Sequence, residues 1–117
     1  MEFSELKNEI ETILINNRGT YVLAYQIYKE LEKINKNKWD KFNQTYTNNI
    51  GAGAGSNYTP ATFIARALGY FTDNKDIKGL EQGDLCVKGI TIKEIQPSPS
   101  QVTLGIWRVT DYSDQNQ

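Results

Sequence analysis

The segment from Asn57 to Phe71 constrains the fold of this chain more than any other, because it carries an explicit helix start signal. The hydroxyl of Thr59 can accept a hydrogen bond from a free backbone N–H of the first turn. Pro60 suits the first helical position, where a missing N–H costs nothing. Tyr58 and Phe63 have the spacing of a hydrophobic staple. These signals predict a helix that begins at Pro60.

This helix has two faces of different chemistry. Its apolar residues recur at helical spacing and form a broad face that can anchor in a core. They are Phe63, Ile64, Ala67, Leu68 and Phe71. The hydrogen-bonding residues of the other face, which fall three to four positions apart, are Thr59, Thr62, Arg66 and Tyr70. A helix that reads a DNA groove is built this way, and so are many amphipathic surface helices.

Two earlier segments also show the helical period. Apolar residues recur at steps of three and four from Phe3 to Leu14, and again from Leu23 to Ile34. The first run ends in the stop signal at residues 16–19, where glycine stands last. The short connection that follows predicts two helices packed at an angle.

An insertion at residues 35–58 separates the second helix from the third. Its first part interleaves aromatic residues with lysines, namely Trp39, Phe42 and Tyr46 with Lys36, Lys38 and Lys41. Rings and cations together can stack bases and contact phosphates. The same pattern fits a short helix near 38–46 whose rings pack on the core under a solvated lysine face. The glycine-rich residues 51–56 lack the flanking features of a phosphate loop, and they predict a flexible linker.

The end of the chain predicts a β-hairpin. Residues 85–95 and 101–109 are rich in β-branched side chains, and they flank the turn-forming residues 96–100. Residues 111–117 are expected to be a disordered tail. We therefore expect one α+β domain over residues 1–110, with three main helices followed by the hairpin.

This order of elements resembles the winged helix-turn-helix superfamily over about residues 3–109, in element order and patterning. In that superfamily the third helix commonly enters the major groove of DNA, and the hairpin wing touches the backbone or the minor groove. The resemblance implies a DNA-binding protein, a transcriptional or mobile-element regulator, with residues 96–100 as the wing tip. The groove-facing residues would be Thr59, Thr62, Arg66 and Tyr70, and the backbone contacts Lys36, Lys38 and Lys41.

The charge pattern leaves a second function open. The formal net charge is −1, whereas a DNA-binding domain is usually basic. No acidic residue occurs between Phe42 and Thr72, so the central part can still face a polyanion. A homodimer would add contacts to DNA. Alternatively, the chain is a winged-helix module for protein–protein interaction, with aromatic anchors at Trp39, Phe42 and Tyr46. Exposure of these rings and of Trp107 would discriminate the two.

Several classes of function are disfavoured by composition. The chain has no histidine and one cysteine, so neither an internal disulfide nor a zinc site is expected. Cys86 lies in an apolar run and is expected to be buried. No nucleophile stands beside a base, so we expect neither an enzyme nor a cofactor. No apolar run is long enough for a membrane span, and the acidic N-terminus is unlike a signal peptide, so a cytoplasmic protein is expected.

Overall fold

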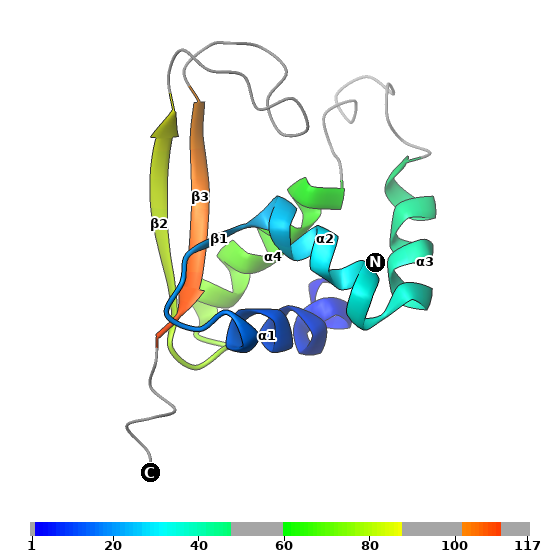
Figure 1. Cartoon of the computed structure of the whole chain (residues 1–117), viewed down its shortest axis with the longest axis horizontal. Coiled ribbons are helices and arrows are strands. Elements are labelled where there is room, and N and C mark those ends of the chain that lie inside the picture. Colours follow the sequence, from blue (N-terminus) through cyan, green and yellow to red (C-terminus); the bar gives the residue numbers. More distant parts are fainter. Residues whose placement is uncertain (1, 48–59, 88–101, 111–117) are drawn as a thin grey trace.

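The computed structural model describes residues 2–47, 60–87 and 102–110. The side chains at positions 46, 47, 87, 102 and 103 lie outside this description. The predictions for the glycine-rich linker, for Thr59, for the hairpin tip and for the C-terminal tail also concern residues outside it. The described part contains a short 3₁₀ helix, four α-helices and a three-stranded antiparallel sheet (Figure 1). The predicted α+β class is confirmed.

The helices, in chain order, are η1 (Phe3–Leu6), α1 (Lys7–Asn16), α2 (Ala24–Ile34), α3 (Lys36–Thr47) and α4 (Pro60–Asn74). The strands are β1 (Val22–Leu23), β2 (Leu80–Val87) and β3 (Val102–Val109). Helix α4 begins at Pro60 as predicted, and it runs three residues beyond the expected end at Phe71.

The sheet differs from the predicted two-stranded hairpin. Its strand order is β1-β3-β2, so the short strand β1 pairs with β3 and adds a third strand. Strand β1 has only two residues, which is too few to show an alternating pattern in the sequence. Strand β2 begins at Leu80, five residues before the predicted strand, and Leu80 pairs with Val109. The backbone N–H of Gly19 donates to the carbonyl of Val109 at 2.9 Å and fixes the turn before β1.

Besides the three main helices, α3 is a fourth helix of 12 residues, and it corresponds to the short helix that the sequence left open near 38–46. Asn35 separates it from α2: its backbone is not helical, with φ −156°, and its Oδ1 accepts a hydrogen bond from the N–H of Lys38 at 3.1 Å. The side chain of Asn35 thereby caps α3. The hydroxyl of Tyr28 on α2 donates to Oδ1 of Asn43 on α3 at 2.5 Å. Helix α3 is therefore held against α2 by specific bonds.

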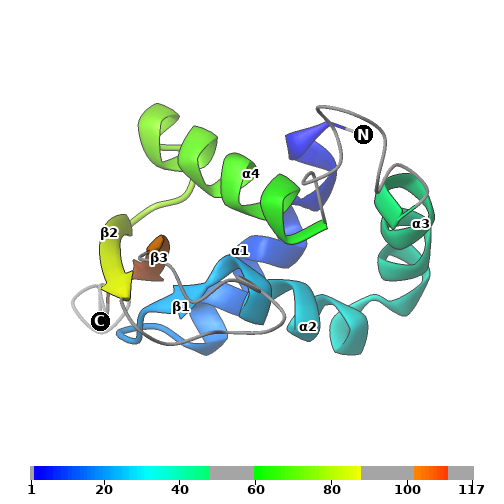
Figure 2. The ribbon, with the colours of Figure 1, turned by 90° about the horizontal axis from the view of Figure 1, so that it is seen from above.

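The core lies between the helices and one face of the sheet, and all four α-helices lie on that side (Figure 2). Every helix except η1 and α3 contributes several side chains to it. Its larger buried members are Leu6, Ile10, Leu14, Ile27, Leu31, Phe42, Phe63, Ile64, Leu68, Phe71, Trp107 and Val109. No polar or charged residue of the described part is fully buried. The helical periods seen in the sequence thus mark the core faces of α1, α2 and α4.

Helix α4 ends in a left-handed residue that is not glycine. Lys75 has φ 57°, its N–H donates to the carbonyl of Thr72 at 3.3 Å, and the N–H of Asp76 donates to the carbonyl of Phe71 at 3.0 Å. This pair of bonds is a Schellman motif, whose left-handed position glycine normally occupies. The buried Ile77 follows and turns the chain back toward β2.

Candidate nucleic-acid interface

The outward face of α4 carries the residues predicted to read DNA. Thr62 is half-buried, Arg66 is exposed, and Tyr70 has 51% of its surface exposed. These three residues follow at steps of four, so they form one row along the helix. The opposite face packs into the core through Phe63, Ile64 and their neighbours. The expected outward orientation is confirmed for Arg66 and Tyr70, while Thr59 lies outside the described residues.

The surface of α4 beside the Thr62–Tyr70 row is open at Gly69. A Cβ atom built at Gly69, which lies next to Tyr70, would meet no atom within 4 Å. On its other flank Tyr70 contacts the ring of Phe3 in η1, with 5.5 Å between the ring centroids. Phe3 in turn contacts Phe63 at 5.1 Å. Helix η1 therefore helps to fix the orientation of the Tyr70 ring.

Lys36 is engaged by acidic and aromatic neighbours. Its Nζ lies 3.0 Å from Oδ1 of Asp40 and 3.8 Å from Oε2 of Glu32. It also lies 4.8 Å from the centroid of the Trp39 ring, within the range of a cation–π contact. A phosphate that bound here would compete with two carboxylates, so Lys36 is a weak candidate for a backbone contact.

Lys38 is more firmly engaged than Lys36. Its Nζ donates to Oε1 and Oε2 of Glu9 at 3.2 and 3.1 Å, and to the carbonyl oxygen of Glu5 at 2.7 Å. The Glu9 side chain is only 15% exposed. Burial by itself raises the pKa of Glu9, but hydrogen bonds from Lys38 and Asn35 outweigh it, and the pKa is lowered. Lys38 therefore joins α3 to α1, and its donors point at acceptors of the same chain.

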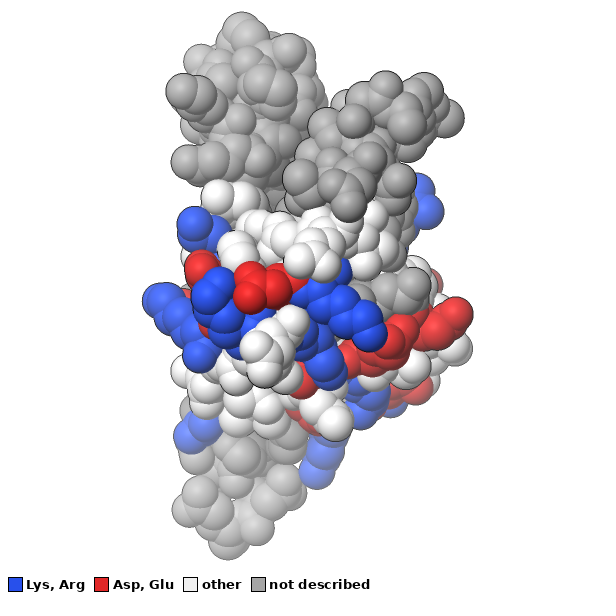
Figure 3. Space-filling view, turned by 90° about the vertical axis from the view of Figure 1, so that its right-hand side faces the viewer, with Lys and Arg blue, Asp and Glu red and all other residues white. Residues whose placement is uncertain are grey.

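Lys41 is the remaining predicted lysine, and it is exposed. Figure 3 shows the side of the molecule where α3 lies, and basic and acidic side chains are mixed across it. Helix α3 stands at the end of the molecule where α4 begins (Figures 1 and 2). The three lysines belong to a helix that lies beside the beginning of α4, at one end of the Thr62–Tyr70 row.

The two aromatic residues of α3 whose side chains the structure describes face inward. Phe42 is 0% exposed and contacts Phe63 with 5.4 Å between the centroids. Trp39 is half-buried and stacks on Tyr28 at 5.7 Å. Trp107 is buried, and its Nε1–H donates to Oε1 of Gln82 at 3.1 Å. The predicted partner surface through Trp39, Phe42 and Tyr46 is therefore wrong for Phe42, which belongs to the core; the Tyr46 side chain lies outside the description.

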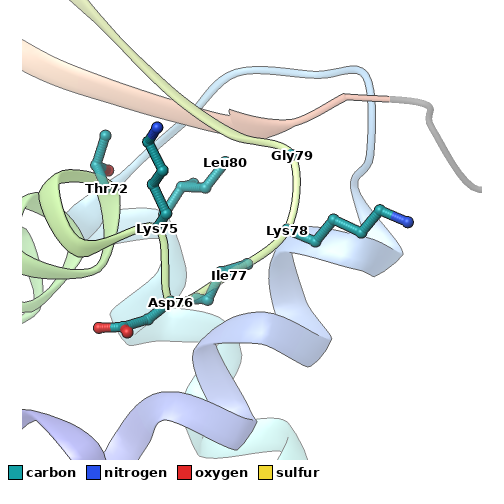
Figure 4. Close-up of a pocket in the computed structure, with 7 residues that line it drawn as sticks. All are labelled: Thr72, Lys75, Asp76, Ile77, Lys78, Gly79 and Leu80. Atoms are coloured by element: carbon teal, nitrogen blue, oxygen red, sulfur yellow. The ribbon is translucent and has the colours of Figure 1, made fainter.

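A shallow pocket of 580 Å³ lies where α4 turns into β2. Its lining residues are Thr72, Lys75, Asp76, Ile77, Lys78, Gly79 and Leu80. The charged ends of Lys75, Asp76 and Lys78 point in three different directions (Figure 4). Small-molecule sites need polar groups that converge on one point. We therefore assign no ligand to this pocket.

No group of three His, Cys, Asp or Glu side chains in the described residues could hold a metal ion. None of the described helices is long and apolar enough to cross a membrane. Cys86 is exposed on β2, contrary to the expectation of a buried thiol, because the second half of β2 extends past the helices (Figure 1).

The chain matches no family model, no curated protein and no solved structure.

The exposed face of the sheet was not predictable as a site from the sequence. Tyr21 and Leu85 are exposed there. The signal available in the sequence was the alternation along β2 and β3. This alternation alone does not place Tyr21 on the same face, because β1, which does so, is too short to be recognised in the sequence.

Proposed function

We propose that this chain is a winged-helix module that binds DNA through the outward face of α4. The observation that carries the proposal is the row formed by Thr62, Arg66 and Tyr70, on a helix whose opposite face is anchored in the core. A helix held in this way presents side chains at fixed positions, which groove reading requires.

The arrangement around α4 supports the same proposal. The order of helices followed by the β2–β3 hairpin is the order on which the winged-helix resemblance rests. Helix α4 packs against α2, and α3 occupies part of the long connection between them. In a winged helix, α4 would enter the major groove, and the tip between β2 and β3 would lie beside it.

The charges predict that such binding is modest. Lys36 and Lys38 are paired with acids, so fewer of the predicted lysines are available to contact phosphates. Each phosphate contact contributes about −0.9 to the slope of log K against log salt. We expect a shallow slope, and an arginine contact to a guanine edge would contribute about 1–3 kcal/mol of discrimination.

The test is fluorescence anisotropy of a labelled mixed-sequence duplex, titrated with protein at low salt and at about 150 mM salt. Arg66→Ala should weaken binding by about tenfold or more, because it removes the cation at the centre of the row. Gly69→Glu should weaken binding through charge repulsion, whereas the matched neutral variant Gly69→Gln should not. The Cβ position of residue 69 is open, so the two variants differ chiefly in charge.

Binding at low salt that Arg66→Ala and Gly69→Glu leave unchanged would place DNA elsewhere on the surface and reject the α4 interface. No binding at low salt would reject DNA binding altogether.

The alternative function is a winged-helix module for protein–protein interaction without nucleic-acid binding. It is favoured by one observation, the mixed charge on the α3 side of the molecule (Figure 3). Because Phe42 is buried, such a module would not use it as an anchor.

A further inference from the structure

The face of the sheet that points away from the helices has an ordered pattern. Tyr21 comes just before β1, and the register aligns it with Arg108 and Glu81 in a row across the sheet. The next row holds Leu23, Ile106 and Gly83, and the row after that holds Leu104 and Leu85. We call these residues the outer face. One charged and aromatic row thus borders two apolar rows.

The outer face is accessible in the described structure. Tyr21 is 38% exposed and Leu85 is 47% exposed, while Leu23, Leu104 and Ile106 are half-buried. The α-helices all lie on the opposite side of the sheet, so no described element covers this one (Figure 2). Because Gly83 has no side chain, the side chain of Ile106 can lie over the edge strand β2. Its Cγ1 is 3.3 Å from the position that a Cβ atom of residue 83 would take. A contiguous apolar surface of this kind marks an interaction site.

The charges of the outer face are balanced. Nε of Arg108 donates to Oε1 of Glu81 at 2.8 Å, and the guanidinium lies 4.5 Å from the centroid of the Tyr21 ring. The face therefore carries one cation and one anion, already paired. A polyanion or a highly charged partner finds no unbalanced charge there. A second copy of the same face carries the same neutral pair, so its approach meets no net charge repulsion.

We propose that a second copy of this chain docks on the outer face, and that the two copies form a dimer with two-fold symmetry. A two-fold interface uses the same patch on both partners, and this patch is compatible with itself in both charge and apolar character. The proposal does not depend on DNA binding. The face points away from α4, so the dimer leaves both copies of α4 open.

The size of the outer face sets the strength of the dimer. A stable interface buries about 800 Å² on each partner, from roughly 20–30 residues. The outer face has eight described residues, fewer than such an interface uses, so we expect a weak dimer with a dissociation constant in the roughly micromolar range. Such a dimer forms and dissociates with concentration.

The test is sedimentation velocity of the full chain, without DNA, from about 1 µM to about 300 µM. The expected result is a shift from monomer to dimer across this range. Leu85→Lys places a charge in the apolar rows, and it should weaken dimerisation by about tenfold or more. Ile34→Lys is the matched control: Ile34 is 40% exposed at the end of α2, away from the sheet, and its replacement should leave dimerisation unchanged.

The single cysteine gives a second measurement. Cys86 is exposed and lies next to Leu85 in β2, so a spin label on it reports one distance between copies. A symmetric dimer should give one distance distribution, whose amplitude Leu85→Lys lowers at concentrations near the dissociation constant of the wild type. A chain that stays monomeric throughout the range, association that continues past two copies, or equal dimerisation by Leu85→Lys and wild type would each overturn the proposal.

Discussion

Nζ of Lys38 lies 3.1 Å from Oε2 of Glu9, so a single charged pair joins helix α3 to helix α1. The same ammonium group donates to the carbonyl oxygen of Glu5, and Asn35 donates to Glu9 from the junction of α2 and α3. A lysine that in the sequence is typical of a phosphate contact is therefore part of the connection between three helices.

The first prediction concerns this pair. Lys38→Ala should lower the free energy of unfolding by about 1–2 kcal/mol, because it leaves the largely buried Glu9 without its charged partner. Lys41→Ala, on the exposed side of the same helix, should change it by less than about 0.5 kcal/mol. Denaturation in urea followed by circular dichroism measures both. Equal effects of the two variants would mean that Lys38 contributes no more than a surface lysine.

The second prediction is a pH dependence. The pKa of Glu9 is lowered in the folded chain, so its ionised form stabilises the fold. That contribution is complete above the ordinary carboxyl pKa of about 4.5, and it is lost as the pH falls through the lowered value. We therefore expect the difference in unfolding free energy between wild type and Glu9→Gln to shrink from about pH 6 to about pH 3. A difference independent of pH would show that the pair does not couple ionisation to folding.

The third prediction concerns the end of α4. Lys75 occupies a left-handed position, with φ 57°, where a side chain costs about 1 kcal/mol. Lys75→Gly should therefore raise the free energy of unfolding by about 0.5–1 kcal/mol. Lys75→Ala is the control, because it removes the charge but keeps the strained Cβ atom, and it should give no gain. Thermal unfolding at equal concentration compares them, and a gain from both variants would assign the effect to charge.

Helices α1, α2 and α4 were predictable from sequence because each carries apolar residues at steps of three and four over several turns. Helix α3 shows only a weak pattern, because most of its residues are polar and few of them reach the core. Strand β1 could not be predicted, because its pairing of Val22 with Trp107 joins residues far apart in the chain. A contact of that kind depends on how the helices pack.

The candidate site, too, was predictable from the sequence only in part. The outward position of Arg66 and Tyr70 follows from the helical period alone, and the sequence was sufficient for it. The pairing of Lys38 with Glu9 depends on the packing of α3 against α1, so the local pattern of lysines and rings could not reveal it. The burial of Phe42 against Phe63 has the same origin.

The fourth prediction compares two glycines that are exchanged for alanine. Trp107 lies across Gly105, and a Cβ atom there would stand 2.4 Å from Cη2 of its ring. Gly105→Ala must therefore displace a buried indole that donates to Gln82, and it should destabilise the fold by about 1–3 kcal/mol. Gly69 has open space in the interior of α4, so Gly69→Ala should stabilise the fold by about 0.5–1 kcal/mol.

Urea denaturation gives the free energies, and tryptophan emission in a Trp39→Phe background reports on Trp107 alone. The emission should shift to the red in Gly105→Ala, because the displaced ring gains contact with water, and it should stay unchanged in Gly69→Ala. If Gly105→Ala is as stable as wild type with unchanged emission, the ring does not rest on Gly105. Its position on the inner face of the sheet would then have to be fixed by the hydrogen bond to Gln82.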